Sequence, residues 1–169
     1  MGPARRAALP EAAKGVWRWL LVAGGVIALD QLTKQWMLDS FQRYELRPVT
    51  GWFNLVLVFN PGASFSFLAG AGGWQKWFFI ILALGVSAWL LAMLRRHAAE
   101  RLLPAALALI VGGALGNVID RLRFGAVVDF LDVHAGGYHW PAFNVADSAI
   151  SIGVVLMILQ QFLQAKEAK

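Results

Sequence analysis

The chain has 169 residues, of which 59% are hydrophobic and only 15% are charged, and its mean hydropathy is +0.59. So little polar surface cannot cover a globule in water, which excludes an ordinary soluble domain and indicates a membrane protein. The sequence contains no cysteine, which excludes disulfides, thiolate catalysis and cysteine-ligated metals. The net charge of +5 would suit nucleic acid, but the basic residues cluster at the ends of apolar segments, so we expect no nucleic-acid partner.

The first apolar segment follows a basic start, an arrangement that is also typical of a signal peptide. It ends in the polar motif 30–34 without a small-residue cleavage site, so we expect an uncleaved first helix over about residues 16–37. Asp30 and Lys34 are four residues apart, which predicts a stabilising ion pair on one helix face. A role in fixing the register of a substrate is the alternative.

Residues 38–73 form a segment that is too long for a simple connection. Its aromatic and β-branched run Trp52–Phe59 predicts a strand, and the following Asn60-Pro61-Gly62 predicts a turn. We therefore expect a small sheet lying on the membrane surface in this first outer loop.

Three further apolar windows, about residues 74–94, 102–122 and 142–163, are each long enough to cross the hydrocarbon core. With the first helix they predict an all-α membrane protein with four transmembrane helices in a single domain, residues 1–169. Positive charge sets the orientation, because basic residues are retained on the cytoplasmic side. The N-terminal segment, the loop between the second and third windows, and the tail share nine basic residues: Arg5, Arg6, Lys14, Arg18, Arg95, Arg96, Arg101, Lys166 and Lys169. Both termini are therefore expected in the cytoplasm, with every aspartate at or beyond the outer helix ends.

The third window ends in a polar face, since Asn117, Asp120 and Arg121 stand at i, i+3 and i+4. We interpret this face as structural: an Asp120–Arg121 pair with an amide would satisfy polar groups at the membrane edge. Just before it, Gly112 and Gly116 form a G-x-x-x-G motif, which favours close helix packing.

Asp129 and Asp147 are the strongest candidates for chemistry. A carboxylate at the edge of hydrocarbon is costly, so its presence there indicates function. If both side chains reach one site, like-charge repulsion raises one pKa and leaves the other group ionised, as in an aspartyl protease. The alternatives are structural: Asp147 in the first turn of a helix capped by Asn144, and Asp129 as a loop carboxylate paired with Arg123.

Other chemistries have weaker support. His134 and His139 lie in a glycine-containing loop at a spacing that is not typical of zinc peptidases, so we expect no metal. Ser148 and Ser151 have no lysine or histidine at helical spacing, which disfavours a serine protease. A small proton-coupled transporter is the competing hypothesis, but it predicts an acid near the middle of a helix, and the acids here lie at the outer ends.

Five sequence blocks together resemble the lipoprotein signal peptidases, also called signal peptidase II: Asp30–Lys34, Asn60–Phe67, Gly112–Leu122, Val127–Phe130 and Pro141–Ile150. The resemblance implies an enzyme of the bacterial cytoplasmic membrane that acts on its outer side. It would cut diacylated prolipoproteins before the lipidated cysteine of the lipobox. It further implies a β-cradle and a short surface helix in the first outer loop, inhibition by globomycin, no cofactor, contact with membrane lipids, and a monomer.

The resemblance also assigns roles to residues. It makes Asp129 and Asp147 the catalytic dyad. It implies a supporting or substrate-binding role for eight others: Asp30, Lys34, Asn60, Gly62, Asn117, Asp120, Arg121 and Asn144. One departure is visible, because Pro61 and Ser64 replace the Thr and Ala usual in the turn block. Pro61 has no backbone donor, so a substrate contact through that amide is not expected.

Overall fold

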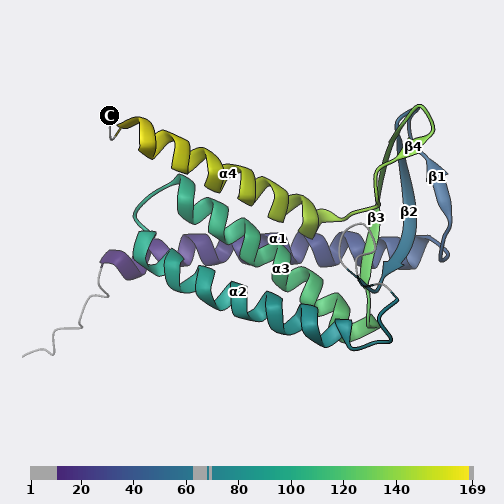
Figure 1. The fold of residues 1–169 in the computed structure, drawn as a ribbon, viewed down its shortest axis with the longest axis horizontal. Helices are drawn as coiled ribbons and strands as arrows, with labels where there is room; N and C mark the ends of the chain where they lie inside the picture. The colour runs from purple at the N-terminus through teal and green to yellow at the C-terminus, as the bar shows by residue number, and fades with distance from the viewer. Residues whose placement is uncertain (1–10, 63–67, 69, 168–169) are drawn as a thin grey trace, which may run out of the picture.

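The computed structural model describes residues 11–62, 68 and 70–167. Four helices lie along the long axis of the molecule, and a small sheet stands across one end (Figure 1). The helices are α1 (Glu11–Ser40), α2 (Gln75–His97), α3 (Leu102–Phe124) and α4 (Val145–Glu167). The beginning of α1 and the end of α4 both lie at the end of the bundle away from the sheet.

Three of the described helices, α2, α3 and α4, are long and apolar enough to cross a membrane. The longer α1 is not in this group, because its 30 residues include the charged side chains of Arg18, Asp30, Lys34 and Asp39. Two of these charges do not face the surroundings, since Asp30 is 0% and Lys34 is 2% exposed. The charges that lower the hydropathy of α1 therefore lie partly inside the bundle.

The sheet is antiparallel, with the order β1-β2-β3-β4, and its strands are Leu46–Pro48, Phe53–Asn60, Val127–Ala135 and Tyr138–His139. The strand expected at 52–59 is therefore present as β2. The expectation of a sheet confined to the first outer loop is wrong, because β3 and β4 come from the segment between α3 and α4. The sequence of Val127–Val133 predicts a strand only weakly, because two aspartates interrupt its apolar residues. No helix occurs in the described part of the first outer loop; the motif residues 63–67 lie outside the described residues.

Helix α3 lies at the centre of the bundle and packs against α1, α2 and α4. Its glycines allow this close approach. A Cβ added to Gly112 would lie 2.8 Å from the backbone oxygen of Ala23, and one added to Gly116 would lie 2.7 Å from a carboxylate oxygen of Asp30. The predicted small-residue motif therefore brings α1 and its buried carboxylate directly against α3.

A second core fixes the sheet to the end of α1. Met37 and Phe41 of α1 pack with Leu57 of β2 and with Val128 and Phe130 of β3. Because neighbouring strand residues point to opposite faces, burial of Val128 and Phe130 on this side turns Asp129 to the other side. The packing of β3 therefore sets the direction of the Asp129 carboxylate.

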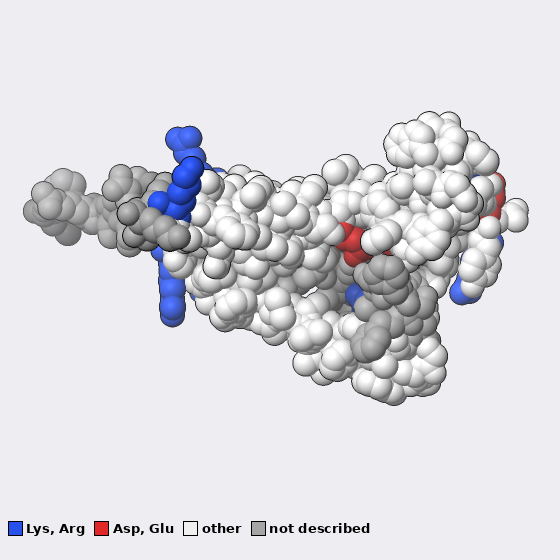
Figure 2. Space-filling view, turned by 45° about the horizontal axis from the view of Figure 1, so that its top comes forward, with Lys and Arg blue, Asp and Glu red and all other residues white. Residues whose placement is uncertain are grey.

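Charge is distributed unevenly along the molecule. Figure 2 shows basic side chains gathered around the end of the bundle away from the sheet, beside a long white stretch of helical surface. The exposed basic residues at this end are Arg18, Arg95, Arg96, Arg101 and Lys166. Exposed tryptophans occur toward both ends of the helices, Trp17 and Trp89 at one end and Trp36, Trp74 and Trp77 at the other. This pattern is typical of a protein that crosses a bilayer.

Candidate active site

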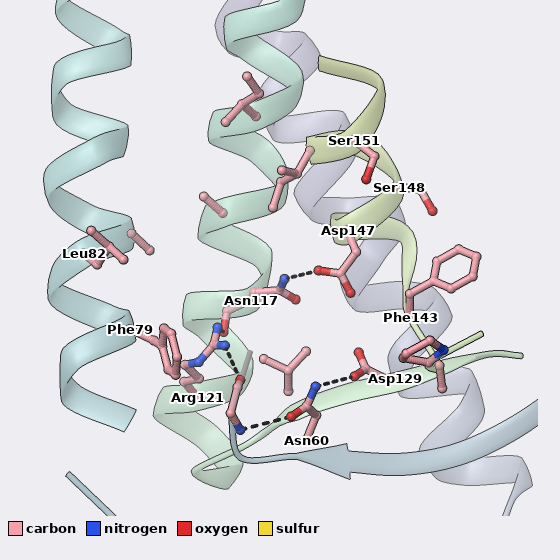
Figure 3. A pocket seen from close by; sticks show the side chains of 18 of the residues that line it. Asn60, Phe79, Leu82, Asn117, Arg121, Asp129, Phe143, Asp147, Ser148 and Ser151 are labelled. Atoms are coloured by element: carbon pink, nitrogen blue, oxygen red, sulfur yellow. Dashed lines mark hydrogen bonds between the residues drawn. The ribbon is translucent and has the colours of Figure 1, made fainter. Parts of the chain in front are cut away.

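Asp129 and Asp147 lie on different elements but face the same space. Asp129 is on β3 and Asp147 is in the first turn of α4, and in Figure 3 their carboxylates point toward one another. Both line a cavity of about 660 Å³. Asp129 is not a loop residue paired with Arg123, because Arg123 instead donates to the side-chain oxygens of Gln31 and Gln35.

Asn144 contacts both aspartates. Its Nδ2 donates to Asp129 Oδ1 at 2.7 Å, and its Oδ1 accepts a hydrogen bond from the backbone N–H of Asp147 at 2.9 Å. The second bond confirms Asn144 as the N-cap of α4. The same residue that begins the helix therefore also orients the strand carboxylate.

Two further amides complete the polar contacts of the two carboxylates. Asn117 Nδ2 donates to Asp147 Oδ1 at 2.8 Å, and Asn60 Nδ2 donates to Asp129 Oδ2 at 3.2 Å. Asn60 is itself held in the turn by a bond from the backbone N–H of Gly62 to its Oδ1. Each carboxylate thus has a neutral amide donor on one side, and no ion pair to either carboxylate is formed by the described residues.

The surroundings of Asp129 favour its protonated form. Burial, followed by the nearby negative charge of Asp147, raises the pKa of Asp129 from its ordinary value to about 7, against the lowering effects of the amides of Asn60 and Asn144 and of the positive charge of Lys34. Near neutral pH about half of the Asp129 side chains therefore carry a proton. The site therefore places a carboxyl group that can carry a proton beside a second carboxylate.

Lys34 is the centre of a buried network behind the cavity. Its ammonium lies 2.8 Å from Asp30 Oδ2 and 2.7 Å from Asp120 Oδ2, and it donates to Asn117 Oδ1 at 3.0 Å. The predicted Asp30–Lys34 pair is confirmed, but it is buried and shared with α3. The predicted Asp120–Arg121 pair is wrong, because consecutive helix residues point about 100° apart and Asp120 faces α1.

The two carboxylates of this network also hold the backbone beside Asp147 and Asp129. Asp30 Oδ1 accepts a hydrogen bond from the backbone N–H of Ala146 at 2.9 Å, and Asp120 Oδ2 accepts one from Val128 at 3.0 Å. Ala146 and Val128 directly precede Asp147 and Asp129. The network therefore fixes both candidate catalytic residues through their neighbours.

Gln31 belongs to this network and was missed by sequence reasoning. Its Nε2 donates to Asp120 Oδ1 at 2.9 Å and contacts the backbone oxygen of Gly116 at 3.3 Å. The only signal in the sequence was its place between Asp30 and Lys34, and a neutral amide gives no electrostatic reason to single it out.

Arg121 approaches the cavity from α3. It donates to the backbone oxygen of Gly62 at 2.9 Å, and its guanidinium lies 5.0 Å from the ring centre of Phe79 (Figure 3). Its buried Nε has no hydrogen-bond partner among the described residues. Arg121 therefore joins α3 to the turn that holds Asn60, and its side chain lines the cavity.

Most of the rest of the cavity wall is apolar, and a large part of it comes from three helices. Phe79, Leu82 and Val86 of α2 face Ile110 of α3 and Ile150 of α4 across it. In Figure 2 acidic atoms are visible in a hollow between the helical body and the sheet. Sequence reasoning did not identify these apolar residues, because a side chain that lines a cavity and one that faces lipid look alike in a hydrophobic helix.

The structure brings the predicted site residues together in two layers. Six line the cavity: Asn60, Gly62, Asn117, Arg121, Asp129 and Asp147. The other four, Asp30, Lys34, Asp120 and Asn144, are fully or almost fully buried next to them. The layer behind the cavity holds the ion pairs of Lys34 with Asp30 and Asp120, and the two candidate catalytic aspartates face the cavity.

The structure also places the histidines and serines that were considered for metal or serine-protease chemistry. His134 and His139 stack with ring centres 4.8 Å apart at the far end of the β3–β4 pair, where His139 bonds to Asp132. No group of three or more metal-ligating side chains occurs in the described part of the chain. Ser148 lines the cavity, but its hydroxyl donates to the backbone oxygen of Asn144.

A family model described as signal peptidase (SPase) II matches residues 22–163. The chain belongs to this family. It is 62% identical over 148 residues to the lipoprotein signal peptidase of Azoarcus sp. (strain BH72), covering 88% of this chain and 84% of that protein. It is 56% identical over 152 residues to the lipoprotein signal peptidase of Ralstonia nicotianae, covering 90% and 88%.

Solved structures agree with this membership. A bacterial membrane enzyme determined by the in meso method at 2.3 Å superposes with a TM-score of 0.81 and 32% identity, covering 90% of this chain and 92% of that one. A second, at 1.9 Å, gives a TM-score of 0.75 and 33% identity, covering 85% and 92%. The chain is thus a membrane peptidase of the signal peptidase II family, which removes the transporter hypothesis.

Proposed function

We propose that this peptidase removes the signal peptide from diacylglyceryl-modified prolipoproteins with Asp129 and Asp147 as its catalytic dyad. The observation that carries the proposal is the shared cavity: two carboxylates from separate elements face it, and one amide, that of Asn144, contacts both residues. The names of the relatives supply the substrate class, and the geometry supplies the mechanism.

The reaction begins with opposite protonation states. Asp129, whose pKa is raised to about 7, donates its proton to the carbonyl oxygen of the scissile peptide. Asp147 takes a proton from a water molecule, whose oxygen adds to the carbonyl carbon. The intermediate collapses when the C–N bond breaks: Asp147 gives its proton to the leaving nitrogen, and Asp129 recovers the proton from the former carbonyl oxygen. Both side chains then return to their starting states.

The apolar wall would position the substrate. Acyl chains and the apolar part of the signal peptide would lie against α2, α3 and α4, so that lipid affinity places the scissile bond between the carboxylates. Pro61 has no N–H to offer, but the next amide, Gly62, is already bonded to Asn60, so the turn keeps its shape without that donor.

We also propose that all four helices cross the bacterial cytoplasmic membrane, with both termini in the cytoplasm and the dyad at the outer surface. The basic residues at the bundle end away from the sheet support this orientation. Neutralisation of Lys34 by Asp30 and Asp120 inside the bundle supports a membrane position for α1, because the charges need not meet lipid.

A cleavage assay tests the proposal. Purified protein in detergent is given a diacylated prolipoprotein and its unlipidated form, with and without a metal chelator. We expect cleavage of the lipidated form alone, unaffected by the chelator, and inhibition by globomycin. Equal cleavage of both forms would contradict positioning by the acyl chains, and loss of activity with the chelator would contradict the dyad mechanism.

A further inference from the structure

Two arginines and three aromatic rings contact one another outside the cavity, on the side of the sheet that faces α1. The guanidinium of Arg43 is 5.1 Å from the ring centre of Tyr44 and 5.2 Å from that of Phe59. Phe59 meets the ring of Phe124 edge-on at 6.0 Å, and the guanidinium of Arg123 is 4.7 Å from that ring. None of these five residues lines the cavity, so the proposed reaction does not use them.

The two guanidiniums keep most of their hydrogen-bonding capacity. Arg43 has no hydrogen bond or ion pair with any residue that the structure describes, and it is exposed. Among the described residues, Arg123 donates hydrogen bonds only to the neutral side-chain oxygens of Gln31 and Gln35, at 3.4 and 3.3 Å. Arg47 differs, since it is paired with Glu45 and also donates to the backbone oxygen of Ser40, both at 2.7 Å. The rings thus contact two cations that form no ion pair with a carboxylate in the described part of the chain.

An apolar stripe leads to these cations along the helices. Leu29, Leu32 and Trp36 stand at i, i+3 and i+7 on α1 and are 55%, 70% and 53% exposed, and Leu122 of α3 is 54% exposed. The bonds from Arg123 to Gln31 and Gln35 bring this end of α3 beside the stripe. The surface therefore has the two parts of an amphiphile-binding site: an apolar face and an anion-binding end.

We propose that Arg43 and Arg123 bind the phosphate groups of anionic phospholipids whose acyl chains lie along this stripe. The planar fork of arginine matches phosphate oxygens, and stacking on a ring keeps the fork oriented. A lipid with net negative charge is favoured over a zwitterionic one, because a zwitterionic lipid brings its own cation to a surface that already holds two. The inference needs only a bilayer around the helices and does not depend on the peptidase mechanism.

Native mass spectrometry of the delipidated protein in an uncharged detergent tests this proposal. Phosphatidylglycerol and phosphatidylcholine with the same acyl chains are titrated against wild type, Arg43→Gln, Arg123→Gln and the double variant. We expect a preference for phosphatidylglycerol that falls about fivefold with each substitution and disappears in the double variant. The matched control is Arg47→Gln, which removes an exposed cation that is already paired and should keep the full preference.

Equal binding of the two lipids by wild type would overturn the proposal, and so would a loss of the lipid preference in Arg47→Gln as large as in the other variants. Displacement of the lipid by an equimolar amount of glycerol 3-phosphate would also overturn it, because that result would indicate a site for free anions. The Arg43→Lys/Arg123→Lys double variant keeps both charges and covers the case in which the glutamine variants do not fold. It should retain a reduced preference, and the unreduced wild-type preference would contradict recognition by the arginine fork. Because cleavage is not measured, failure here leaves the proposed function untouched.

Discussion

Two pairs of aspartates, buried or half-buried where the helices meet the sheet, have different partners. Asp30 and Asp120 share the ammonium of Lys34, at 2.8 and 2.7 Å, whereas Asp129 and Asp147 are bonded to amides of asparagines. The shared ammonium ties the first pair to the surrounding structure, while two neighbouring carboxylates with no ion pair among the described residues can share a proton. The partner, more than the residue type, separates the supporting pair from the reactive pair.

Removing either member of the amide-bound pair should have the largest effect on activity. Asp129→Asn and Asp147→Asn should each lower kcat by about a thousandfold or more, because one proton donor or acceptor is lost. Both variants should keep a melting temperature close to that of wild type, since asparagine has almost the same shape. Cleavage assays and thermal unfolding check this, with Asp132→Asn, on the same strand but outside the cavity, as the control.

Removing the cation should have the largest effect on stability. Lys34→Met leaves Asp30 and Asp120 buried without a cation, which should cost about 3–5 kcal/mol of unfolding free energy. Lys166→Met, at an exposed position near the end of α4, should change the stability little. Unfolding in mixed micelles measures both variants, and equal stabilities would show that Lys34 does not neutralise the pair.

A conservative change within the cation-bound pair should lower stability and activity together. Asp120→Asn weakens the contact with Lys34 and the bond from Val128, at a cost of about 1–3 kcal/mol. Activity should fall because Val128 precedes Asp129 on β3. If the Asp120→Asn variant kept its melting temperature, the structural role of Asp120 would be wrong.

The raised pKa of Asp129 should make activity depend on pH. The acid form donates the proton, so the rate should fall about tenfold per pH unit above about pH 7. The stability should also fall as the pH rises, because the folded state binds this proton more tightly than the unfolded state. The contribution of the Asp129 proton to the free energy of unfolding is full below about pH 4 and is lost as the pH rises to about 7. The Asp129→Asn variant should not lose stability over this pH range. If its stability depended on pH in the same way as that of wild type, Asp129 would not be the source of the pH dependence.

The smallest expected effect concerns the apolar wall. Leu82→Trp would fill part of the cavity and should raise KM severalfold, with a smaller change in kcat, because positioning is disturbed more than chemistry. Leu84→Trp is the matched control, because Leu84 lies on the same helix and is similarly exposed, 47% against 50% for Leu82, but is outside the cavity. Equal KM values for the two variants would mean that the substrate does not occupy this wall.

Much of this arrangement could be predicted from the sequence. Helix length indicated the four helices, and the run before Asn60 indicated β2. The resemblance of five sequence blocks to signal peptidase II indicated ten residues that lie in the cavity wall or directly behind it. The pairing of Asp120 could not be found, because helical spacing shows which residues share a face but not which helix lies opposite that face. The strand β3 was missed for a related reason: its aspartates break the apolar pattern in order to face the cavity and the neighbouring strand. Tertiary contacts, which leave no local signal, decided both points.

Titration of the Asp129 carboxyl group by ¹³C nuclear magnetic resonance tests the shared-proton account most directly. Labelled wild type would be compared with Asp147→Asn across pH 3–9. The account predicts that Asp129 titrates near pH 7 in wild type and at a lower pH in the variant, still above its ordinary value because burial remains. A wild-type Asp129 that titrates near pH 4, or one whose pKa does not change when Asp147 loses its charge, would contradict it.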